Sequence, residues 1–539
     1  MDSSKPIRVA KRHLNQLRVG ATPPEAVDLF DADWYATQGT GSRLGHPATL
    51  EHYLKTGWRE GYSPNALFDS AWYLETNPDV RHQKLEPLSH YGEFGWREGR
   101  NPHPLFDVAY YFRESPDVNA HKFEPLAHFI KRGWLLGLKP HPLFHTEMYV
   151  LDNQADMPAG IDPLTHFVTA GWLDGNDPNP LFETLWYLKN YPEVEHCGLD
   201  PLSHYISKGA ALGYDPGPEF STQGFVKRYP EVGSQQQALS RYFTDGQKNG
   251  LQSVPSRLVG QVMSVSIPTT IVGTIPPSQR SLAIIASHDR RGSIGIATQH
   301  LANAFRSRGF AVALAYDHAV TNAETGIAAG GADAVITADH EGYDFYSWRM
   351  SLESLDLQDT YDEIIILNDS VIGPFGDFDR MLAAWRALPF DVTGLIESPD
   401  PYRHIQSWGV RFSGAAATPS ALLSVYGKTR PVMKKGQLIE LLEIPLGDNF
   451  HNLGYSTGSL FSAISTPVRT RNPTIFGWRS LLAGGMPFVK RDTVSPNHSF
   501  VEHRPADVIA AVTALHPEAS TYSAAEIVAD SLAQLGDSS

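Results

Sequence analysis

The chain has 539 residues, more than one hydrophobic core usually serves, so two or three domains are expected. Its net charge of −15 argues against nucleic acid or an anionic membrane surface as the main partner. Its single cysteine, Cys197, excludes an intrachain disulfide bond and a zinc cluster of cysteines, and fits a reducing compartment.

Residues 1–25 are predicted to form an N-terminal tail. They include five lysine and arginine residues but lack the apolar stretch of a signal peptide. A solvated tail is favoured over a membrane contact. No segment of the sequence approaches the roughly 20 apolar residues of a membrane-spanning helix. The sequence therefore predicts a cytosolic protein, with peripheral association at the inner membrane left open.

A repeat with a period of 38 residues runs through residues 26–255 and fades in its sixth copy. The repeated phenylalanines are Phe30, Phe68, Phe106, Phe144, Phe182 and Phe220. The repeated histidines are His52, His90, His128, His166 and His204, and the repeated glycines are Gly57, Gly95, Gly133, Gly171 and Gly209. One unit cannot bury its own aromatic face, so the units are expected to stack into an all-α, solenoid-like array.

Each unit is predicted to hold two short helices. Asp69 offers an N-cap for the first helix, which Asn77 and Pro78 end. Pro87 opens the second helix at its first turn, and Gly95 helps to end it.

Two residue types in the array have competing interpretations. The histidines stand one repeat apart and so do not converge on a metal, which favours hydrogen-bonded core imidazoles. The tryptophans at 58, 96, 134 and 172 are interpreted as core, with a sugar-stacking platform as the alternative. The repeat resembles units found beside bacterial glycosyltransferases and other surface-polysaccharide or secreted proteins, so it does not identify a chemistry. A protein partner bound through the repeats stays open.

Residues 256–280 are rich in proline and are predicted to be a linker. From residue 281 the pattern changes to strands alternating with helices, which predicts an α/β domain with a parallel sheet and helices on its faces. The predicted strands cover residues 282–286, 310–316, 334–336, 364–367 and 392–396, and a helix covers residues 294–308.

The segment YDEIIILNDS, residues 361–370, is the strongest candidate for a site in this domain. Its apolar run is typical of a strand buried on both faces of a sheet. It ends in Asn368, Asp369 and Ser370, and ligands bind outside the carboxyl ends of such strands. A carboxylate there can hold a divalent cation, which in turn can hold a diphosphate. A plain strand-to-turn transition is the structural alternative.

Four blocks in order carry a resemblance to a known family: GYDFYSWR at 342–349, YDEIIILNDSVIGP at 361–374, GLIES at 394–398 and HIQSW at 404–408. From Ser281 to about Phe500 the chain resembles the rhamnan synthesis protein F family of bacterial rhamnosyltransferases, within a domain predicted to cover residues 281–503. The resemblance implies a GT-A-like, nucleotide-sugar-binding α/β domain. The chain departs from the family at residues 412–429, where an aromatic-rich helix is replaced by alanine and serine, which affects the acceptor side.

The resemblance also implies roles for individual residues around the donor nucleotide. Asp369 is expected to contact the metal or the diphosphate, with Asn368 and Ser370 orienting it. The stretch with Asp344, Trp348 and Arg349 is expected to line the nucleotide. Arg349 can pair with a phosphate.

The base that activates the acceptor is expected at the end of another strand. Glu397 follows the predicted strand 392–396 and is the first candidate, on a strand next to that of Asp369. His404 is the alternative base, and Gln406 is expected to join the nucleotide site.

Other polar groups are given structural interpretations. Asp377 and Asp379 form a D-x-D pattern, interpreted as the cap and first turn of a helix. Glu440 and Glu443 are interpreted as a helical surface pair. Lys490 and Arg491, near the C-terminus, could face a diphosphate. Residues 504–539 are predicted to be a helical tail rather than part of a site.

The resemblance therefore implies an inverting glycosyltransferase that uses a nucleotide-sugar donor, first of all dTDP-rhamnose, with Mg²⁺ or Mn²⁺ as a possible cofactor. The acceptor is expected to be a bacterial surface glycan or its lipid-linked precursor. The alternatives are the same fold with a GDP- or UDP-sugar, and a non-catalytic scaffold in polysaccharide assembly.

Overall fold

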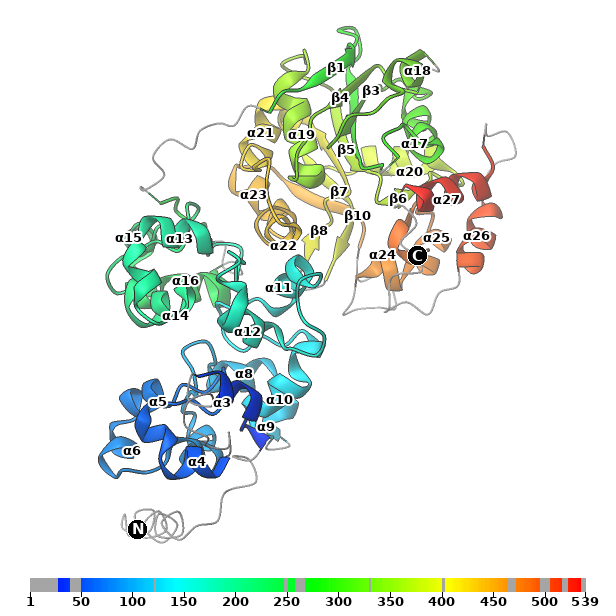
Figure 1. Ribbon diagram of the computed structural model, residues 1–539. Coiled ribbons are helices and arrows are strands. Elements are labelled where there is room, and N and C mark those ends of the chain that lie inside the picture. The colour runs from blue at the N-terminus through cyan, green and yellow to red at the C-terminus, as the bar shows by residue number, and fades with distance from the viewer. Residues whose placement is uncertain are drawn as a thin grey trace, which may run out of the picture. The chain divides into compact units, whose positions relative to one another are not determined.

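The computed structural model divides the chain into two compact units, Met1–Val262 and Met263–Ser539 (Figure 1). It describes residues 28–38, 50–120, 123–246, 251–256, 267–289, 291–328, 331–399, 403–462, 472–494, 505–515 and 522–534. The predicted tail of residues 1–25 lies outside this set, as do residues 257–266 of the predicted linker. None of the helices within the described ranges combines the length and the apolar character needed to cross a membrane.

The first unit is rich in helices that recur with the sequence repeat. The first helix of each repeat is α3 (Ala32–Thr37), α5 (Ser70–Thr76), α8 (Val108–Glu114), α11 (Thr146–Asn153), α13 (Thr184–Asn190) and α15 (Thr222–Arg228). The second is α4 (Leu50–Lys55), α7 (Pro87–Glu93), α10 (Pro125–Lys131), α12 (Pro163–His166), α14 (Pro201–His204) and α16 (Ala238–Arg241). The helical turn around the repeated glycine is η1 (Gly57–Glu60), η2 (Gly95–Glu98), η3 (Gly133–Leu136), η4 (Phe167–Gly171), η6 (Tyr205–Gly209) and η9 (Tyr242–Gly246).

The predicted caps hold, but the first helix is followed by a further helical turn. The Asp69 side chain accepts a hydrogen bond from the Trp72 N–H at the start of α5. Pro78 does not lead into a loop; it opens a short helix, α6 (Pro78–His82), because proline is tolerated at a first helical turn. The same turn recurs as α9 (Pro116–Ala120), η5 (Pro192–His196) and η7 (Pro230–Val232).

The repeated histidine is hydrogen-bonded, as predicted, and it is buried in three repeats and half-buried in the two that hold His52 and His128. In five successive repeats a buried tyrosine hydroxyl and the histidine Nδ1 atom lie 2.7–3.0 Å apart. The pairs are Tyr35–His52, Tyr73–His90, Tyr111–His128, Tyr149–His166 and Tyr187–His204. The tyrosine also explains why glycine recurs in each repeat. A Cβ atom at the glycine would lie 2.0–2.2 Å from the tyrosine hydroxyl.

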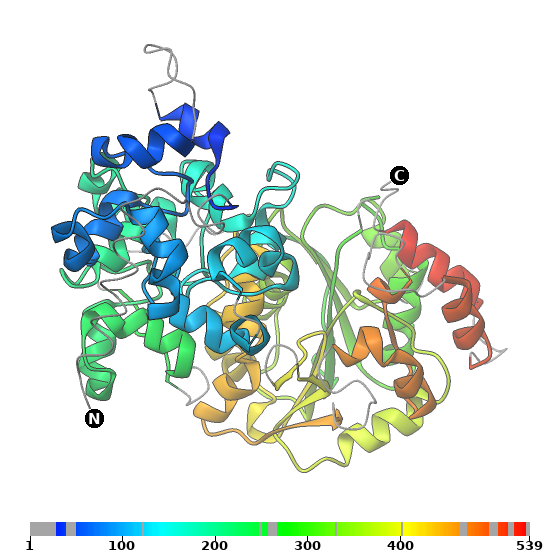
Figure 2. The same ribbon diagram turned by 90° about the horizontal axis from the view of Figure 1, so that it is seen from below.

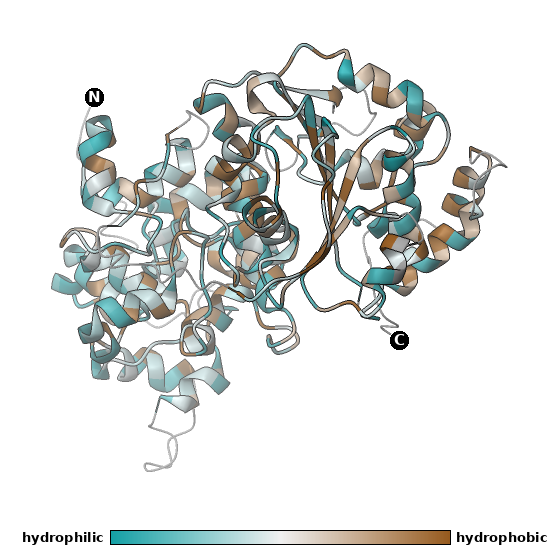
Figure 3. Ribbon diagram, turned by 90° about the horizontal axis from the view of Figure 1, so that it is seen from above, coloured by the Kyte–Doolittle hydropathy of each residue, from teal (hydrophilic) through white to brown (hydrophobic). Residues whose placement is uncertain are grey.

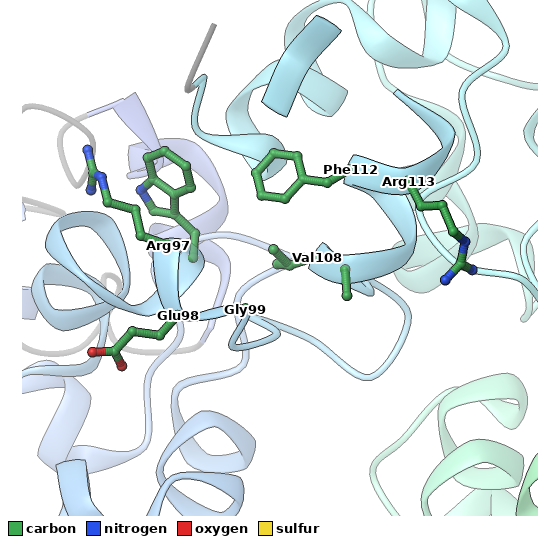
Figure 4. Close-up of a pocket in the computed structure, with 8 residues that line it drawn as sticks. Arg97, Glu98, Gly99, Val108, Phe112 and Arg113 are labelled. Carbon is green, nitrogen blue, oxygen red and sulfur yellow. The ribbon is translucent and has the colours of Figure 1, made fainter. Parts of the chain in front are cut away.

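A pocket of about 740 Å³ lies between the second and third repeats (Figure 4). Trp96, on its wall, is only 4% exposed, and its indole N–H donates to the Gly92 carbonyl over 3.0 Å. The Arg97 guanidinium lies 4.1 Å from the centre of the Trp96 ring and covers one face of it. These contacts favour the core interpretation of this tryptophan over a sugar-stacking platform.

The second unit is built on a mixed sheet of nine strands. Its strands are β1 (Thr270–Gly273), β2 (Ser281–Ser287), β3 (Ala311–Tyr316), β4 (Ala334–Thr337), β5 (Glu363–Asn368), β7 (Val392–Ser398), β8 (His404–Ile405), β9 (Gly409–Ser413) and β10 (Thr457–Phe461). The order is β1-β4-β3-β2-β5-β9-β7-β10, with β8 paired to β7. Strands β4, β3, β2 and β5 are parallel, whereas β9 is antiparallel to both of its neighbours. A separate pair joins β6 (Val371–Ile372) to β11 (Val489–Lys490).

Helices cover both faces of this sheet (Figure 2). The helices of the unit are α17 (Ile296–Arg306), α18 (Ala323–Ala328), α19 (Tyr343–Ser354), α20 (Phe378–Arg386), α21 (Pro419–Tyr426), α22 (Lys435–Leu438), α23 (Leu446–Asn452), α24 (Pro473–Phe476), α25 (Trp478–Ala483), α26 (Pro505–Thr513) and α27 (Ala524–Ala533). Helices α19, α21 and α23 pack on one face, and α17 and α20 pack on the other. The strands between them are largely hydrophobic (Figure 3), which fits burial on both faces.

The structure corrects the predicted linker. Residues 270–273 form β1, which pairs antiparallel with β4 at the edge of the sheet. At the other end of the predicted linker, the Ser256 hydroxyl donates to the buried Asp215 carboxylate of the first unit. Both ends of the segment therefore belong to folded units.

Candidate functional site

Asp369 lies directly after β5, at the carboxyl edge of the sheet, and it is only 7% exposed. Its backbone N–H donates to the Ala286 carbonyl on the parallel neighbour β2, which fixes the turn. One carboxylate oxygen accepts hydrogen bonds from the Ser287 hydroxyl (2.7 Å) and the His288 backbone N–H (3.0 Å). The guanidinium of Arg491 lies 3.4 Å from the same carboxylate oxygen.

A second carboxylate, Asp344 at the start of α19, belongs to the same cluster. The Asn368 side-chain amide donates to Asp344 over 2.6 Å. Burial, together with the negative charge of Asp369, raises the pKa of Asp344 to about 7. The structure therefore brings together two predicted carboxylates and a predicted amide from separate blocks of the sequence.

Two basic residues complete this cluster because β11 pairs with β6. The pairing places Lys490 opposite Val371, and the Lys490 ammonium donates to the Ser370 hydroxyl over 3.0 Å. Burial lowers the pKa of Lys490. Arg491 donates from its backbone N–H to the Ser370 carbonyl. Both signs of charge thus meet beside the end of β5.

The C-terminal helix α27 is part of the structure behind this cluster. The Arg491 guanidinium donates to the Ser531 hydroxyl (3.0 Å) and to the Gln534 carbonyl oxygen (2.8 Å). Asp530, on the same helix, accepts hydrogen bonds from Arg291 and from the Ala297 N–H. Residues 504–539, predicted to be a helical tail, therefore include a helix that holds the arginine that contacts Asp369.

Glu397 lies at the carboxyl end of β7, but not on a strand next to that of Asp369. The antiparallel strand β9 lies between β5 and β7. Val410 on β9 is level with both Ile366 and Gly394, and Asp369 and Glu397 each stand three residues beyond those positions. The two carboxylates therefore share one edge of the sheet at a separation of about two strand spacings, roughly 10 Å.

Glu397 is a buried, hydrogen-bonded carboxylate beside a pocket of about 270 Å³. It accepts hydrogen bonds from Arg403 Nε (2.9 Å) and from the Ser462 hydroxyl (2.6 Å). His404 and Asp448 also line the pocket. The two candidate bases thus lie together, away from the charged cluster around Asp369.

Three residues that were predicted to line the nucleotide make contacts within the protein. Trp348 has no exposed surface, and its indole N–H donates to the Leu367 carbonyl, so it supports β5 from the core. Arg349 pairs with Glu353 on its own helix over 2.9 Å rather than with the cluster. Gln406 is buried, and its side-chain oxygen accepts a hydrogen bond from the Trp408 indole.

The D-x-D pattern has the structural role that the sequence predicted. The Asp377 side chain accepts a hydrogen bond from the Arg380 N–H and caps α20. Asp379 forms a surface ion pair with Arg308. Glu440 and Glu443 lie in a helical turn, η11 (Ile439–Glu443).

Tyr343, which precedes Asp344, was missed in the sequence. It is 45% exposed and has a φ of 51°, an unusual backbone conformation for a residue other than glycine. Such strain is concentrated at functional sites. An aromatic residue between Gly342 and an acidic residue at a helix start was the available signal.

Comparison with known proteins finds similarity in the second unit. Residues 314–529 match the family model described as rhamnan synthesis protein F. An uncharacterized protein of Sinorhizobium fredii, y4gN, is 24% identical over 239 residues, which is 41% of this chain and 61% of the relative. The chain thus spans less than two thirds of this relative's length, and no solved structure matches it. Over residues 314–529 the second unit is therefore similar to the rhamnan synthesis protein F family.

Proposed function

We propose that the second unit is a glycosyltransferase domain of GT-A-like fold that moves rhamnose from dTDP-rhamnose to a bacterial surface polysaccharide or its lipid-linked precursor. The family match supports a glycosyltransferase-like role in rhamnan synthesis. The sheet of the second unit has helices on both faces. This arrangement agrees with the nucleotide-binding α/β sandwich that the resemblance implies.

The observation that carries this proposal is the charged cluster at the end of β5. A nucleotide-sugar leaves a diphosphate, which needs cationic partners as negative charge develops on it. Lys490 and Arg491 supply two such groups, and Asp369 and Asp344 supply oxygen ligands. Exposed Tyr343 is a candidate to stack on the nucleobase.

Asp369 and Asp344 fit a divalent cation. Mg²⁺ and Mn²⁺ prefer carboxylate oxygens. Burial and the negative charge of Asp369 both raise the pKa of Asp344, and a bound cation would offset the repulsion between the two carboxylates. When bound, the cation would neutralise charge on the departing diphosphate. In that arrangement Asp369 is held in place by Ser287 and Arg491.

Glu397 is the proposed base for an inverting transfer. Its separation of roughly 10 Å from Asp369 leaves room for a sugar ring between the base and the diphosphate. Hydrogen bonds from Arg403 and Ser462 orient the carboxylate, which is the group that would take the proton. The adjoining pocket, lined by His404, is the proposed place of the acceptor hydroxyl.

The test is release of nucleoside diphosphate from dTDP-rhamnose and from GDP- and UDP-sugars, with a rhamnan fragment as acceptor and with or without Mg²⁺ or Mn²⁺. We expect Asp369→Asn to reduce turnover by at least about 100-fold, the scale of losing one well-placed electrostatic group. Asp379→Asn is the matched control, because Asp379 is an exposed carboxylate paired with Arg308. It should retain turnover.

The scaffold alternative predicts a different pattern. A scaffold would show no turnover with any donor, and Asp369→Asn would then change neither nucleotide binding nor stability with ligand. Thermal stabilisation by nucleoside diphosphates that is lost in Asp369→Asn would support the proposed donor site even where the acceptor is wrong. Normal turnover of Asp369→Asn would overturn the placement of the site.

A further inference from the structure

A cluster of two histidines and one aspartate lies at the ends of β2 and β3. These parallel strands pair Ser287 with Tyr316, so His288 and Asp317 follow at the same level, and His318 comes next. Within the described parts of the chain, these three residues form the one group of at least three His, Cys, Asp or Glu side chains whose ligand atoms converge, all within 4.8 Å of one another.

Both imidazoles direct the same nitrogen at one carboxylate. The His288 Nδ1 atom lies 2.8 Å from Asp317, and the His318 Nδ1 atom lies 2.6 Å from it. The His318 Nε2 atom lies 2.8 Å from the Asp289 carbonyl oxygen, which only accepts hydrogen bonds, so Nε2 carries a proton. If the His318 ring is neutral, its Nδ1 atom then carries no proton, and its lone pair would face a lone pair of the Asp317 carboxylate.

A cation between the nitrogen and the carboxylate removes this conflict. The cation can be a proton on each ring, or one metal ion that both rings and the carboxylate share. A metal-binding histidine usually donates its other ring N–H to a carbonyl or carboxylate, which is the arrangement of His318 and Asp289. The buried Asp289 side chain is itself held by Arg291, which fixes this carbonyl.

We propose that His288, Asp317 and His318 bind a divalent transition-metal ion, with Zn²⁺ as the best match. Two imidazoles and one carboxylate, with a further position open, are typical of Zn²⁺ and related ions rather than of Mg²⁺, which prefers oxygen ligands. The side chains are 48%, 18% and 26% exposed, respectively, so an ion can enter and keep an open position.

The proposed metal site goes beyond the proposed transfer, because Asp369 and Asp344 do not take part in it. The two sites are nevertheless linked by the chain. The His288 backbone N–H donates to Asp369, so an ion that fixes His288 also fixes one hydrogen bond to that carboxylate.

The test is Co²⁺ titration of the full chain, followed by visible absorption, with Zn²⁺ and Mg²⁺ as competitors. We expect one equivalent of Co²⁺ to give a ligand-field band that Zn²⁺ removes and Mg²⁺ does not. His318→Ala and Asp317→Asn should weaken Co²⁺ binding by at least about 100-fold, the upper end of the loss from removing an outer partner of a ligand. His451→Ala, which removes an exposed histidine of α23, is the control and should bind as the wild type does.

Circular dichroism establishes that each variant is folded, and His318→Gln provides a second variant whose amide can still donate to the Asp289 carbonyl. Asp344→Asn separates the two proposals, because it should impair transfer but keep the Co²⁺ band. Unchanged Co²⁺ affinity in folded His318→Gln and Asp317→Asn would overturn the metal site. So would the absence of stoichiometric Co²⁺ binding to the wild type at micromolar concentrations, which would leave two protonated histidines around Asp317.

Discussion

The Arg491 guanidinium donates a hydrogen bond to the backbone carbonyl of Asp369 and lies 3.4 Å from its carboxylate. The two residues are far apart in the sequence, and Arg491 is only 4% exposed. Because Gln534 and Ser531 on α27 accept further hydrogen bonds from the same guanidinium, the C-terminal helix is joined through one arginine to the candidate site.

Replacing Arg491 by lysine tests this connection. Lysine keeps the charge but cannot reach Asp369, Ser531 and Gln534 at once, so buried acceptors lose their donors. We expect Arg491→Lys to lower the free energy of unfolding by about 1–3 kcal/mol in urea and to weaken nucleotide binding. Arg479→Lys is the control, because Arg479 is 59% exposed and lies 3.8 Å from Asp507. Equal stability of the two variants would show that the connection does not matter.

Asp344→Asn should separate stability from function. Asp344 has a folded pKa of about 7, above the usual unfolded value of about 3.9, so it lowers the stability of the fold as the pH rises from about 4 to about 7. Asparagine can still accept the Asn368 hydrogen bond. We therefore expect the variant to be more stable than the wild type by about 1–2 kcal/mol at pH 8, with a smaller difference at pH 5, a range reduced because the side chain is partly exposed.

The same variant should lose sugar transfer at every pH. Urea unfolding at pH 5 and pH 8, beside the transfer assay, checks both halves of this prediction. A variant that is less stable than the wild type at pH 8 would show that the Asp344 carboxylate stabilises the fold and is not held under strain for binding.

The strands that the sequence predicted are those with continuous apolar runs, such as residues 364–367, because burial on both faces demands such runs. Strand β9 was missed because Arg411 interrupts its pattern. In the structure the Arg411 guanidinium pairs with the buried Glu363 carboxylate over 2.8 Å, a contact between distant segments that no local pattern contains. Without β9, the strand of Glu397 was wrongly placed beside that of Asp369.

The candidate site, like the strands, could be predicted only where a local sequence pattern marks it. Polar residues immediately after an apolar strand, such as Asp369 and Glu397, are visible in the sequence. The long-range contacts of α27 with Arg491 are not, because an alanine-rich amphipathic helix has the same pattern whether it packs on a core or on a site. Trp348 was assigned to the nucleotide by resemblance, although its indole is fully buried against β5.

The proposed solenoid-like stacking of the repeats predicts that the glycine and the tyrosine of each repeat are energetically coupled. Gly95→Ala places a methyl group 2.2 Å from the Tyr73 hydroxyl, so this variant should be strongly destabilised. Tyr73→Phe should cost about 1–3 kcal/mol, because the buried His90 Nδ1 atom loses its partner. In the double variant the hydroxyl is absent, so we expect the cost to be smaller than the sum of the two single costs.

Urea unfolding of the four proteins in this double-mutant cycle gives the coupling free energy. Gly99→Ala serves for comparison: it also places alanine in the second repeat, but at a φ of 75° with no atom within 4 Å. Its cost should come from backbone strain alone and should not change when Tyr73 is replaced. Additive effects of Gly95→Ala and Tyr73→Phe would argue against the contact that explains the repeated glycine.

Glu397→Gln tests the proposed base. Glutamine keeps the shape and can still accept a hydrogen bond from Arg403 or Ser462, but it cannot take a proton from the acceptor. We expect turnover to fall by about 10²- to 10⁴-fold, the usual contribution of a general base, with donor affinity nearly unchanged because Asp369 lies roughly 10 Å away. His404→Ala should instead raise the acceptor KM more than it lowers kcat. Initial rates with both substrates varied measure these quantities. If Glu397→Gln kept full turnover and His404→Ala were inactive at unchanged donor affinity, the base would be His404.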